Sequence, residues 1–470
     1  MKNLGRFRLV AWTLVVVLVA GANPAAGGPF EPLSIEKERQ LGEEFFLEIQ
    51  SYYAISTDPF VSSYINRLGR KLESHLGPHT YKYRFYVIDD PTFNAFAVPG
   101  GYIFINSGFI RAMEREGELV GVLAHEISHI SARHIARQME ESRTVNIATL
   151  VGSLAALLLG GPAAAALLIG TQAAGLSAML KYSRDHEHEA DNLGFKLMTK
   201  AGYNPRDMIS VFKKLNKQRW YQGGDIPQYL STHPHTDERL VELSNQYCLH
   251  ANKMAAGDED PDFQYFALKV EATTGNPHQL FRRMSQSHLG DPKNPVYLFG
   301  KAIALARLDR PEEAEAAFDQ ALSLDPRNYV LQREKALQYF DRNRYQEALP
   351  LLMRLSQSQP KDEVVLYYLG RVYQQQRQTD LALASMERVY SLNPAFVEVY
   401  LNLGTLYGEK GRLGLAHYFL GLHSLTARAY PTALFHFKKA LTNMPITDPH
   451  YSRLQGQIAR LEKMKVKVAN

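Results

Sequence analysis

Residues 121–130 read GVLAHEISHI and contain the pattern His-Glu-x-x-His, formed by His125, Glu126 and His129. The apolar spacing of the surrounding run, residues 114–139, predicts one long helix. Two histidines four positions apart lie on one helix face, where neutral imidazoles can bind one Zn²⁺ at about 2.0–2.1 Å. Glu126 lies beside that face and can take a proton from water and pass it to a leaving amine. The motif is short and also occurs in unrelated helices, so zinc requires support from elsewhere in the chain.

A catalytic zinc site needs a third protein ligand and an open fourth position. Ala132 and Ile135 exclude the class of site that takes Gly and His at these two positions. The other class takes a Glu from a later helix, and DHEHEADNLG supplies Glu187 with Asp191 on the same helix face. Glu187 would bind zinc, and Asp191 would accept the N–H of a ligand histidine and fix its orientation. Three rivals offer ligand chemistry but lack an acid four positions downstream: His186, His188 and Glu189.

The first residues have the composition of a secretory signal peptide. Basic residues within 1–8 precede an apolar run at 9–20 and small residues at 20–22. The apolar run has 12 residues, whereas a membrane span needs about 20. We therefore expect residues 1–22 to be removed and the mature chain to be exported; a retained anchor is the alternative.

Charge and cysteine content exclude several classes of protein. The 470 residues carry 53 Lys and Arg against 48 Asp and Glu, and loss of the signal leaves a charge of about +2. With no basic run, nothing predicts binding to nucleic acid. Cys248 is the only cysteine, so no intrachain disulfide can form.

Residues 149–180 are almost uncharged and raise the question of a membrane hairpin. Gly160-Gly161-Pro162 interrupts them, and the half before this break is too short to cross a bilayer. We expect two short helices that pack on the core or contact a membrane surface peripherally.

The C-terminal half repeats with a period of 34 residues. Proline recurs at 292, 326, 360 and 394, and small and apolar residues precede it at constant offsets. The matching sets are Ala314, Phe318, Ala321; Ala348, Leu352, Leu355; Ala382, Met386, Val389; and, before Pro445, Ala433, Phe437, Ala440. This period is typical of tetratricopeptide helix pairs, which stack into a superhelix with a concave protein-binding surface. We expect this domain at residues 262–465, after a linker.

Residues 28–255 are predicted to form the other domain, which is mostly helical with a small sheet. Alternation in YKYRFYVID predicts one strand, and AVPGGYIFINSGFI predicts a Pro-Gly-Gly turn followed by a strand from Tyr102 to Asn106. The fold class is therefore mostly α, with a small β-sheet beside the metal motif and a repeat superhelix after it.

His125-Glu126-x-x-His129 followed by Glu187-x-x-Ala190-Asp191 resembles the zinc metallopeptidases that include the CAAX prenyl endopeptidases and the HtpX-type heat-shock proteases. NAFAVPGGYIFINSGFI is similar to the strand region of that family. The resemblance implies a zincin-like fold, one zinc ion per chain and endopeptidase activity. An export signal before the domain and tetratricopeptide repeats behind it resemble a periplasmic branch of the family. For that branch the implied substrates are unfolded or stalled outer-membrane proteins, and the implied partner is the β-barrel assembly machinery.

The resemblance also implies roles for a loop and a strand. STHPHTDERL is similar to a family segment that places His233 in the fourth zinc position, where it would keep the enzyme latent or, once displaced, stabilise an oxyanion. Arg239 would position this loop or stabilise developing negative charge, and His235 fits less well. The alternative is a capped helix start, with Thr236 or Asp237 near its N-terminus. Tyr102, Ile103 and Phe104 would form an edge strand that pairs with the substrate backbone, unless the strand is an ordinary internal one.

Two functions from different classes follow. The first is a periplasmic zinc endopeptidase, with chaperone-like activity, in the quality control and assembly of outer-membrane β-barrel proteins. The alternative is a repeat scaffold whose zinc site is structural or closed by His233. Prenyl-protein processing inside a membrane would need several complete spans, which the sequence does not predict.

Overall fold

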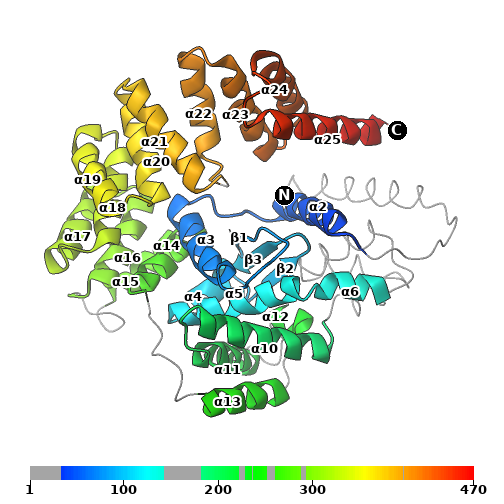
Figure 1. Ribbon diagram of the computed structural model, residues 1–470. Helices are drawn as coiled ribbons and strands as arrows, with labels where there is room; N and C mark the ends of the chain where they lie inside the picture. The colour runs from blue at the N-terminus through cyan, green and yellow to red at the C-terminus, as the bar shows by residue number, and fades with distance from the viewer. Residues whose placement is uncertain are drawn as a thin grey trace, which may run out of the picture.

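The computed structural model describes residues 33–141, 182–221, 228–234, 237–250, 260–286, 293–394 and 396–469. The predicted signal peptide at 1–22, the apolar segment at 149–180, His235 and most of the predicted linker lie outside these residues. Within them, no helix combines the length and the apolar character needed to cross a membrane. Figure 1 shows a first part built around a small sheet and a second part made of a curved array of paired helices.

The first part surrounds the sheet with helices on both faces. Its helices are α2 (Ile35–Tyr52), α3 (Pro59–Glu73), α4 (Ser107–Arg111), α5 (Glu116–Ser131), α6 (His134–Glu141), α10 (Arg184–Lys200), α11 (Arg206–Tyr221), α12 (Gln228–Thr232) and α13 (Asp237–His250). Local capping defines several of them. The Asp58 carboxylate accepts from the backbone N–H groups of Phe60 and Val61 at the start of α3, and Ser183 caps α10 by accepting from His186.

The sheet has three strands in the order β1-β3-β2. β1 (Arg84–Ile88) is parallel to β3 (Tyr102–Asn106), and β2 (Ala95–Val98) is antiparallel to β3 on its other side. Gly100 and Gly101 make the tight turn before β3, with φ angles of 80° and 96° that favour glycine. The expectation that Tyr102, Ile103 and Phe104 form an edge strand is therefore wrong. Both backbone edges of β3 are paired, because the turn folds β2 back against it. β1 and β2 are the edge strands: Ile55 forms an isolated bridge with Ile88 on the outer side of β1, and the outer side of β2 has no pairing among the described residues.

Alternate residues of the strands face opposite layers, as the period-2 pattern predicts. Phe85, Ile103 and Ile105 join the core formed with α3 and α5. Tyr102 and Phe104 join a smaller core against α2. The sheet is thus buried on both faces, and α5 lies directly beneath it with all residues from Glu116 to Ile130 buried.

The helix predicted over residues 114–139 is broken into α5 and α6. Arg133 lies at the break with a φ angle of 55° and turns the chain after Ser131. Its guanidinium Nε donates to Glu38 of α2 at 2.8 Å, and this buried carboxylate holds the turn in place. A tertiary contact therefore decides the break, at a position where the sequence contains neither Gly nor Pro.

The second part consists of α14 (Phe263–Thr274), α15 (Pro277–Ser285), α16 (Pro295–Arg307), α17 (Pro311–Leu324), α18 (Tyr329–Asp341), α19 (Tyr345–Ser358), α20 (Glu363–Gln375), α21 (Thr379–Leu392), α22 (Val399–Glu409), α23 (Leu413–Thr426), α24 (Tyr430–Asn443) and α25 (Tyr451–Ala469). Asp309, Asn343, Arg377 and Gly411, each 34 residues from the next, adopt positive φ at the turns between paired helices. The alanine and large apolar positions that define the repeat are all buried. The predicted fold class is confirmed.

The first repeats and the sheet-containing part share one hydrophobic core. This core extends from α3 and α5 to Leu331 in α18, and a second core begins at Ala336. Further along the array, Glu363 of α20 accepts hydrogen bonds from Ser63 at 2.7 Å and from Arg70 at 3.1 Å, both on α3. The array is therefore held against α3 by apolar and charged contacts. The domain division at residues 255–262 stays a prediction.

Candidate metal centre

Four buried side chains meet where α5, α10 and the end of α12 come together. His125, His129, Glu187 and His233 each offer one ligand atom, and these atoms all lie within 4.8 Å of one another. His125 Nε2 lies 2.9 Å from His129 Nε2 and 3.3 Å from His233 Nδ1. Glu187 Oε1 lies 3.1 Å from His233 Nδ1 and 3.5 Å from His129 Nε2. A tetrahedral zinc ion with bonds of about 2.0–2.1 Å holds its ligand atoms roughly 3.3–3.4 Å apart, so this group fits one ion.

Local structure explains why these side chains meet. The two histidines occupy one face of α5, as their spacing predicts. The Ser183 cap starts α10 so that Glu187 falls in its first turn, where it is completely buried. α10 can approach α5 closely because residue 194 is glycine, and a Cβ there would lie 3.3 Å from the backbone nitrogen of His125.

The ionisation of these groups suits a metal cation. Burial, and then the neighbouring histidines, lowers the pKa of His129 well below its usual range, so its ring is neutral. Burial raises the pKa of Glu187, but Arg239 and His233 outweigh this effect and the pKa is lowered overall. Neutral imidazole and ionised carboxylate are the forms that bind Zn²⁺. Glu187 Oε1 faces His233 and His129, so it is the oxygen that a metal would use.

A buried pair of Asp191 and Arg239 supports the centre from behind. Arg239 Nε and Nη2 donate to the two oxygens of Asp191 at 2.6 Å and 2.8 Å, and its Nη1 lies 2.5 Å from Glu187 Oε2. Asp191 Oδ1 lies 3.0 Å from His125 Nδ1. Burial raises the pKa of Asp191, but the Arg239 charge and these hydrogen bonds lower it to about 2. Arg239 Nη1 also donates to the carbonyl of Pro234 at 2.9 Å. These contacts favour a loop-positioning role for Arg239 over contact with a reacting group.

Glu126 lies beside the four converging side chains and is completely buried. Its Oε1 accepts from the Tyr229 hydroxyl at 3.4 Å and lies 3.6 Å from His233 Nε2. Burial keeps the Tyr229 pKa well above its usual range, so this hydroxyl retains its proton. Glu126 Oε2 has no hydrogen-bond partner among the described residues, and is therefore the oxygen that can accept a proton from water.

The sequence did not predict a functional role for three residues that contact the centre. The Tyr182 ring stacks on His129 with centroids 3.8 Å apart, and the Tyr229 ring stacks on His233 at 4.5 Å. His134, which lies on the wrong face of a continuous helix to be a ligand, is turned back at the Arg133 break, and its Nδ1 lies 2.7 Å from His129 Nδ1. Only Tyr229 carries a usable signal, since it precedes His233 by one helical turn.

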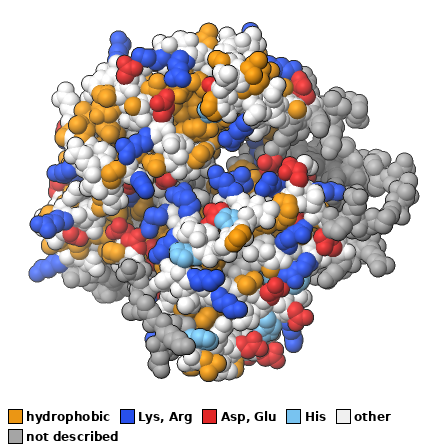
Figure 2. Space-filling model, viewed as in Figure 1, with side chains coloured by type: hydrophobic (Ala, Val, Ile, Leu, Met, Phe, Trp, Pro, Cys, Tyr) orange, Lys and Arg blue, Asp and Glu red, His pale blue; other side chains and the backbone are white. Residues whose placement is uncertain are grey.

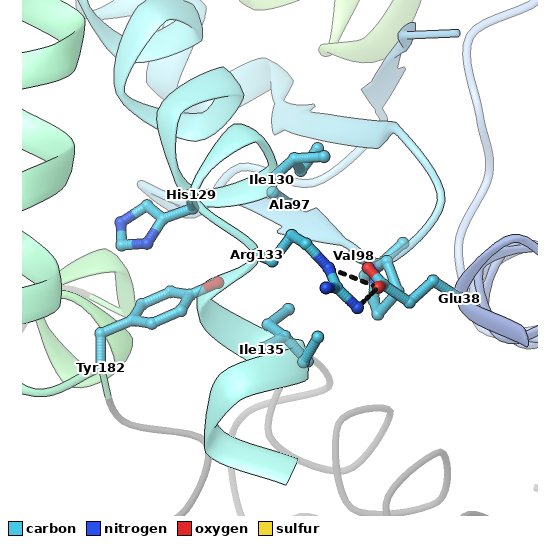
Figure 3. A pocket seen from close by; sticks show the side chains of 10 residues that line it. Glu38, Ala97, Val98, His129, Ile130, Arg133, Ile135 and Tyr182 are labelled. Atoms are coloured by element: carbon cyan, nitrogen blue, oxygen red, sulfur yellow. Dashed lines mark hydrogen bonds and ion pairs between the residues drawn. The ribbon is translucent and has the colours of Figure 1, made fainter. Parts of the chain in front are cut away.

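A narrow hollow opens beside His129. Its lining includes Ala97 and Val98 of β2, Ile135 of α6 and Tyr182. Figure 3 shows His129 and Tyr182 on one side of this hollow and the hydrogen-bonded Arg133–Glu38 pair on the other. The hollow therefore connects β2 to the candidate metal centre.

Comparison with known families agrees with this geometry. Residues 59–247 match the sequence model of peptidase family M48, and residues 295–328 and 367–416 match models of the tetratricopeptide repeat. The fold and the buried His/Glu centre thus define a zinc metallopeptidase followed by a repeat domain.

Three named relatives align with different shares of the chain. The β-barrel assembly-enhancing protease of Escherichia coli (strain K12) is 29% identical over 343 residues, covering 70% of this chain and 69% of that protein. The protein of the same name from Yersinia pestis is 28% identical over 366 residues, covering 76% and 74%. The mitochondrial metalloendopeptidase OMA1 of Schizosaccharomyces pombe is 29% identical over 217 residues, covering 46% and 62%. The chain is a zinc metallopeptidase whose residues 59–247 match family M48, followed by C-terminal tetratricopeptide repeats.

Proposed function

We propose that the protein is a periplasmic zinc endopeptidase that degrades unfolded or stalled outer-membrane β-barrel proteins and assists their assembly. The observation that carries this proposal is the buried His/His/Glu/His group on a His-Glu-x-x-His helix, joined to a repeat array. Relatives named β-barrel assembly-enhancing proteases, which align through both parts, support the substrate class. The predicted signal peptide supports the compartment.

The proposed chemistry assigns one role to each group. His125, His129 and Glu187 would hold Zn²⁺, which would supply the Lewis acidity that polarises the scissile carbonyl and activates water. Glu126 takes the proton of the attacking water on Oε2 and delivers it to the departing amine. The Tyr229 hydroxyl holds the other Glu126 oxygen in place.

His233 is proposed to close the site at rest. Its Nδ1 lies 3.1–3.3 Å from Glu187 Oε1 and His125 Nε2, where a fourth ligand would be expected. A catalytic zinc needs an open position, so His233 has to move away before a substrate carbonyl can enter. The loop is tied down by the Arg239–Pro234 hydrogen bond, so opening requires that this bond break or that the loop rotate around it.

We propose β2, in place of β3, as the strand to which the substrate backbone adds. β2 pairs on one side only within the described residues, and Ala97 and Val98 line the hollow next to His129. Backbone pairing of this kind binds peptides with little sequence selectivity. A peptide that stays uncleaved on Glu126→Gln should slow amide hydrogen exchange in residues 95–98. Unchanged exchange there, with slowing elsewhere, would rule out β2.

The repeat array is proposed to bind the substrate or the assembly machinery. Figure 2 shows hydrophobic side chains gathered over the repeat helices on the face toward the viewer. The exposed large apolar residues of the array include Leu381, Leu401, Leu413 and Phe435, each about half exposed. Surfaces of this kind mark protein contacts.

The test is cleavage of a denatured β-barrel protein by the zinc-loaded full chain. Wild type is compared with Glu126→Gln and His233→Ala, with Glu140→Gln and His250→Ala as matched controls outside the centre. We expect no cleavage by Glu126→Gln, wild-type rates for both controls and faster cleavage by His233→Ala. If every variant binds zinc and none cuts, the endopeptidase proposal fails and the closed-site scaffold replaces it.

A further inference from the structure

His134 is a fully buried histidine that the proposed chemistry does not use. Its Nδ1 lies 2.7 Å from His129 Nδ1, and its Nε2 lies 3.2 Å from Glu189 Oε2. The ring of His186 stacks on it at 4.4 Å with an interplanar angle of 20°. His134 reaches this place because the Arg133 break directs α6 away from the α5 axis.

The ring nitrogen of His129 that faces the metal centre decides which atom donates in each hydrogen bond between His129, His134 and Glu189. His129 Nε2 faces His125 and Glu187, so a metal would take its lone pair and the proton has to be on Nδ1. His129 Nδ1 then donates, and His134 Nδ1 has to accept. A neutral His134 with an unprotonated Nδ1 carries its proton on Nε2, which donates to Glu189.

This series of hydrogen bonds ends near the surface, at the ion pair between Glu189 and Arg137. Arg137 Nη2 donates to the same Glu189 oxygen at 2.8 Å, and both side chains are about two-fifths exposed. The first histidine of the motif, His125, has comparable support, since its Nδ1 faces Asp191, which is held by Arg239. Each histidine therefore leads through its outer nitrogen to a carboxylate paired with arginine, directly for His125 and through a second imidazole for His129.

We propose that His134 is a positioning residue of the metal centre, which accepts the Nδ1 proton of His129, holds Nε2 toward the metal and couples that ligand to Glu189. The proposal rests on the proposed role of His129 as a zinc ligand. Outer partners of metal-bound histidines fix both the tautomer and the ring orientation, and their loss typically weakens metal binding about 10- to 100-fold.

The experiment measures zinc affinity of the full chain by competition with a chromophoric chelator. His134→Asn and His134→Leu are a matched pair of similar shape, because the Asn side-chain oxygen takes the place of Nδ1 as acceptor and Leu offers none. Glu189→Gln weakens the hydrogen bond that His134 Nε2 donates, at a partly exposed site. His188→Leu is the control. His188 lies on α10, as Glu189 does, and its ion-pair partner is the exposed Glu242. Cobalt substitution adds a spectroscopic readout of ligand geometry.

We expect His134→Leu to bind zinc about tenfold more weakly or worse, with an altered cobalt spectrum. His134→Asn should recover most of the affinity and the wild-type spectrum, Glu189→Gln should bind about two- to fivefold more weakly, and His188→Leu should be unchanged. Equal losses in the Asn and Leu variants, or a folded Leu variant with wild-type affinity, would overturn the proposal. If His134→Leu does not fold, an unchanged affinity in Glu189→Gln overturns it. A separate His129→Ala variant that keeps full zinc stoichiometry would instead refute the proposed ligand set.

Discussion

Arg239→Met should strongly destabilise the zinc-free protein. Arg239 is 1% exposed and compensates two buried carboxylates, those of Asp191 and Glu187. Methionine preserves most of the apolar stem but removes the charge, all the hydrogen bonds and the guanidinium group that lies 4.8 Å from the centroid of the Phe212 ring. The carboxylates then remain buried without their arginine, and the folded state loses stability.

The magnitude follows from the burial of the pair. Removing one partner of a buried ion pair typically costs about 3–5 kcal/mol. The core that contains the centre extends from α3 to Leu331, and a folding unit of this size loses roughly 2 °C in Tm for each kcal/mol. We therefore expect the transition of this unit to fall by about 6–10 °C. Bound zinc would reduce the effect, because its charge lies beside Glu187.

The assay is differential scanning calorimetry of the full chain, with chelator and with zinc. Arg184→Met is the matched control, since Arg184 is 72% exposed and its distance to Glu238 is 3.9 Å; its Tm should change by about 2 °C or less. Asp191→Asn added to Arg239→Met should recover part of the loss, because it removes one uncompensated charge. If Arg239→Met folds and has the same Tm as wild type in the presence of chelator, the reasoning is refuted.

Three further predictions concern the wider molecule. Burial, with Asp260 nearby, raises the pKa of Asp262 to about 6, so stability from this group is present below the unfolded pKa of about 4 and lost as the pH rises through 6. Asp262→Asn should therefore raise the free energy of unfolding, measured by urea unfolding, by about 1–2 kcal/mol at pH 7.5 and leave it unchanged near pH 4. An equal gain at both pH values would contradict this pH dependence. Gly69→Ala should lower the free energy of unfolding by about 1–3 kcal/mol, because the new Cβ would lie 2.0 Å from the Phe85 ring. The control Gly456→Ala places a Cβ with nothing within 4 Å and should be neutral or stabilising. Equal changes in Tm for the two variants would exclude this packing argument. Adding free zinc at about 100 times its dissociation constant should stabilise by about 2.7 kcal/mol in wild type and Glu126→Gln but not in His125→Ala, and a chelator-insensitive wild type would argue against the metal site.

The sequence predicts those features that depend on spacing within one element. The 34-residue period fixes the repeat helices, and the acid placed four residues after Glu187 distinguishes this residue from Glu189 as the one that lies among the buried histidines. Glu189 instead lies outside them, 3.2 Å from His134 Nε2. These inferences use only local periodicity, which a helix preserves in any context.

Features that depend on tertiary contacts are not encoded in such spacing. The break at Arg133 requires Glu38 from α2, and the central place of β3 depends on which way the Pro99–Gly101 turn folds β2 back. Tyr182 reaches His129 across elements far apart in the chain, so no motif marks it. Spacing therefore identifies three of the four converging residues, the family resemblance adds His233, and neither identifies Tyr182.

The continuous core that reaches Leu331 has a consequence for dissecting the molecule. A shortened chain that stops near residue 255 would expose Phe60 and Tyr64 of α3, which pack against Phe266, to water and should be insoluble or poorly folded. The smallest autonomous folding unit that retains the metal centre should extend through α18. The later helices, which pack in their own core, could then be exchanged or lost with less damage to the fold, so partner choice could diverge among relatives while the chemistry stays the same.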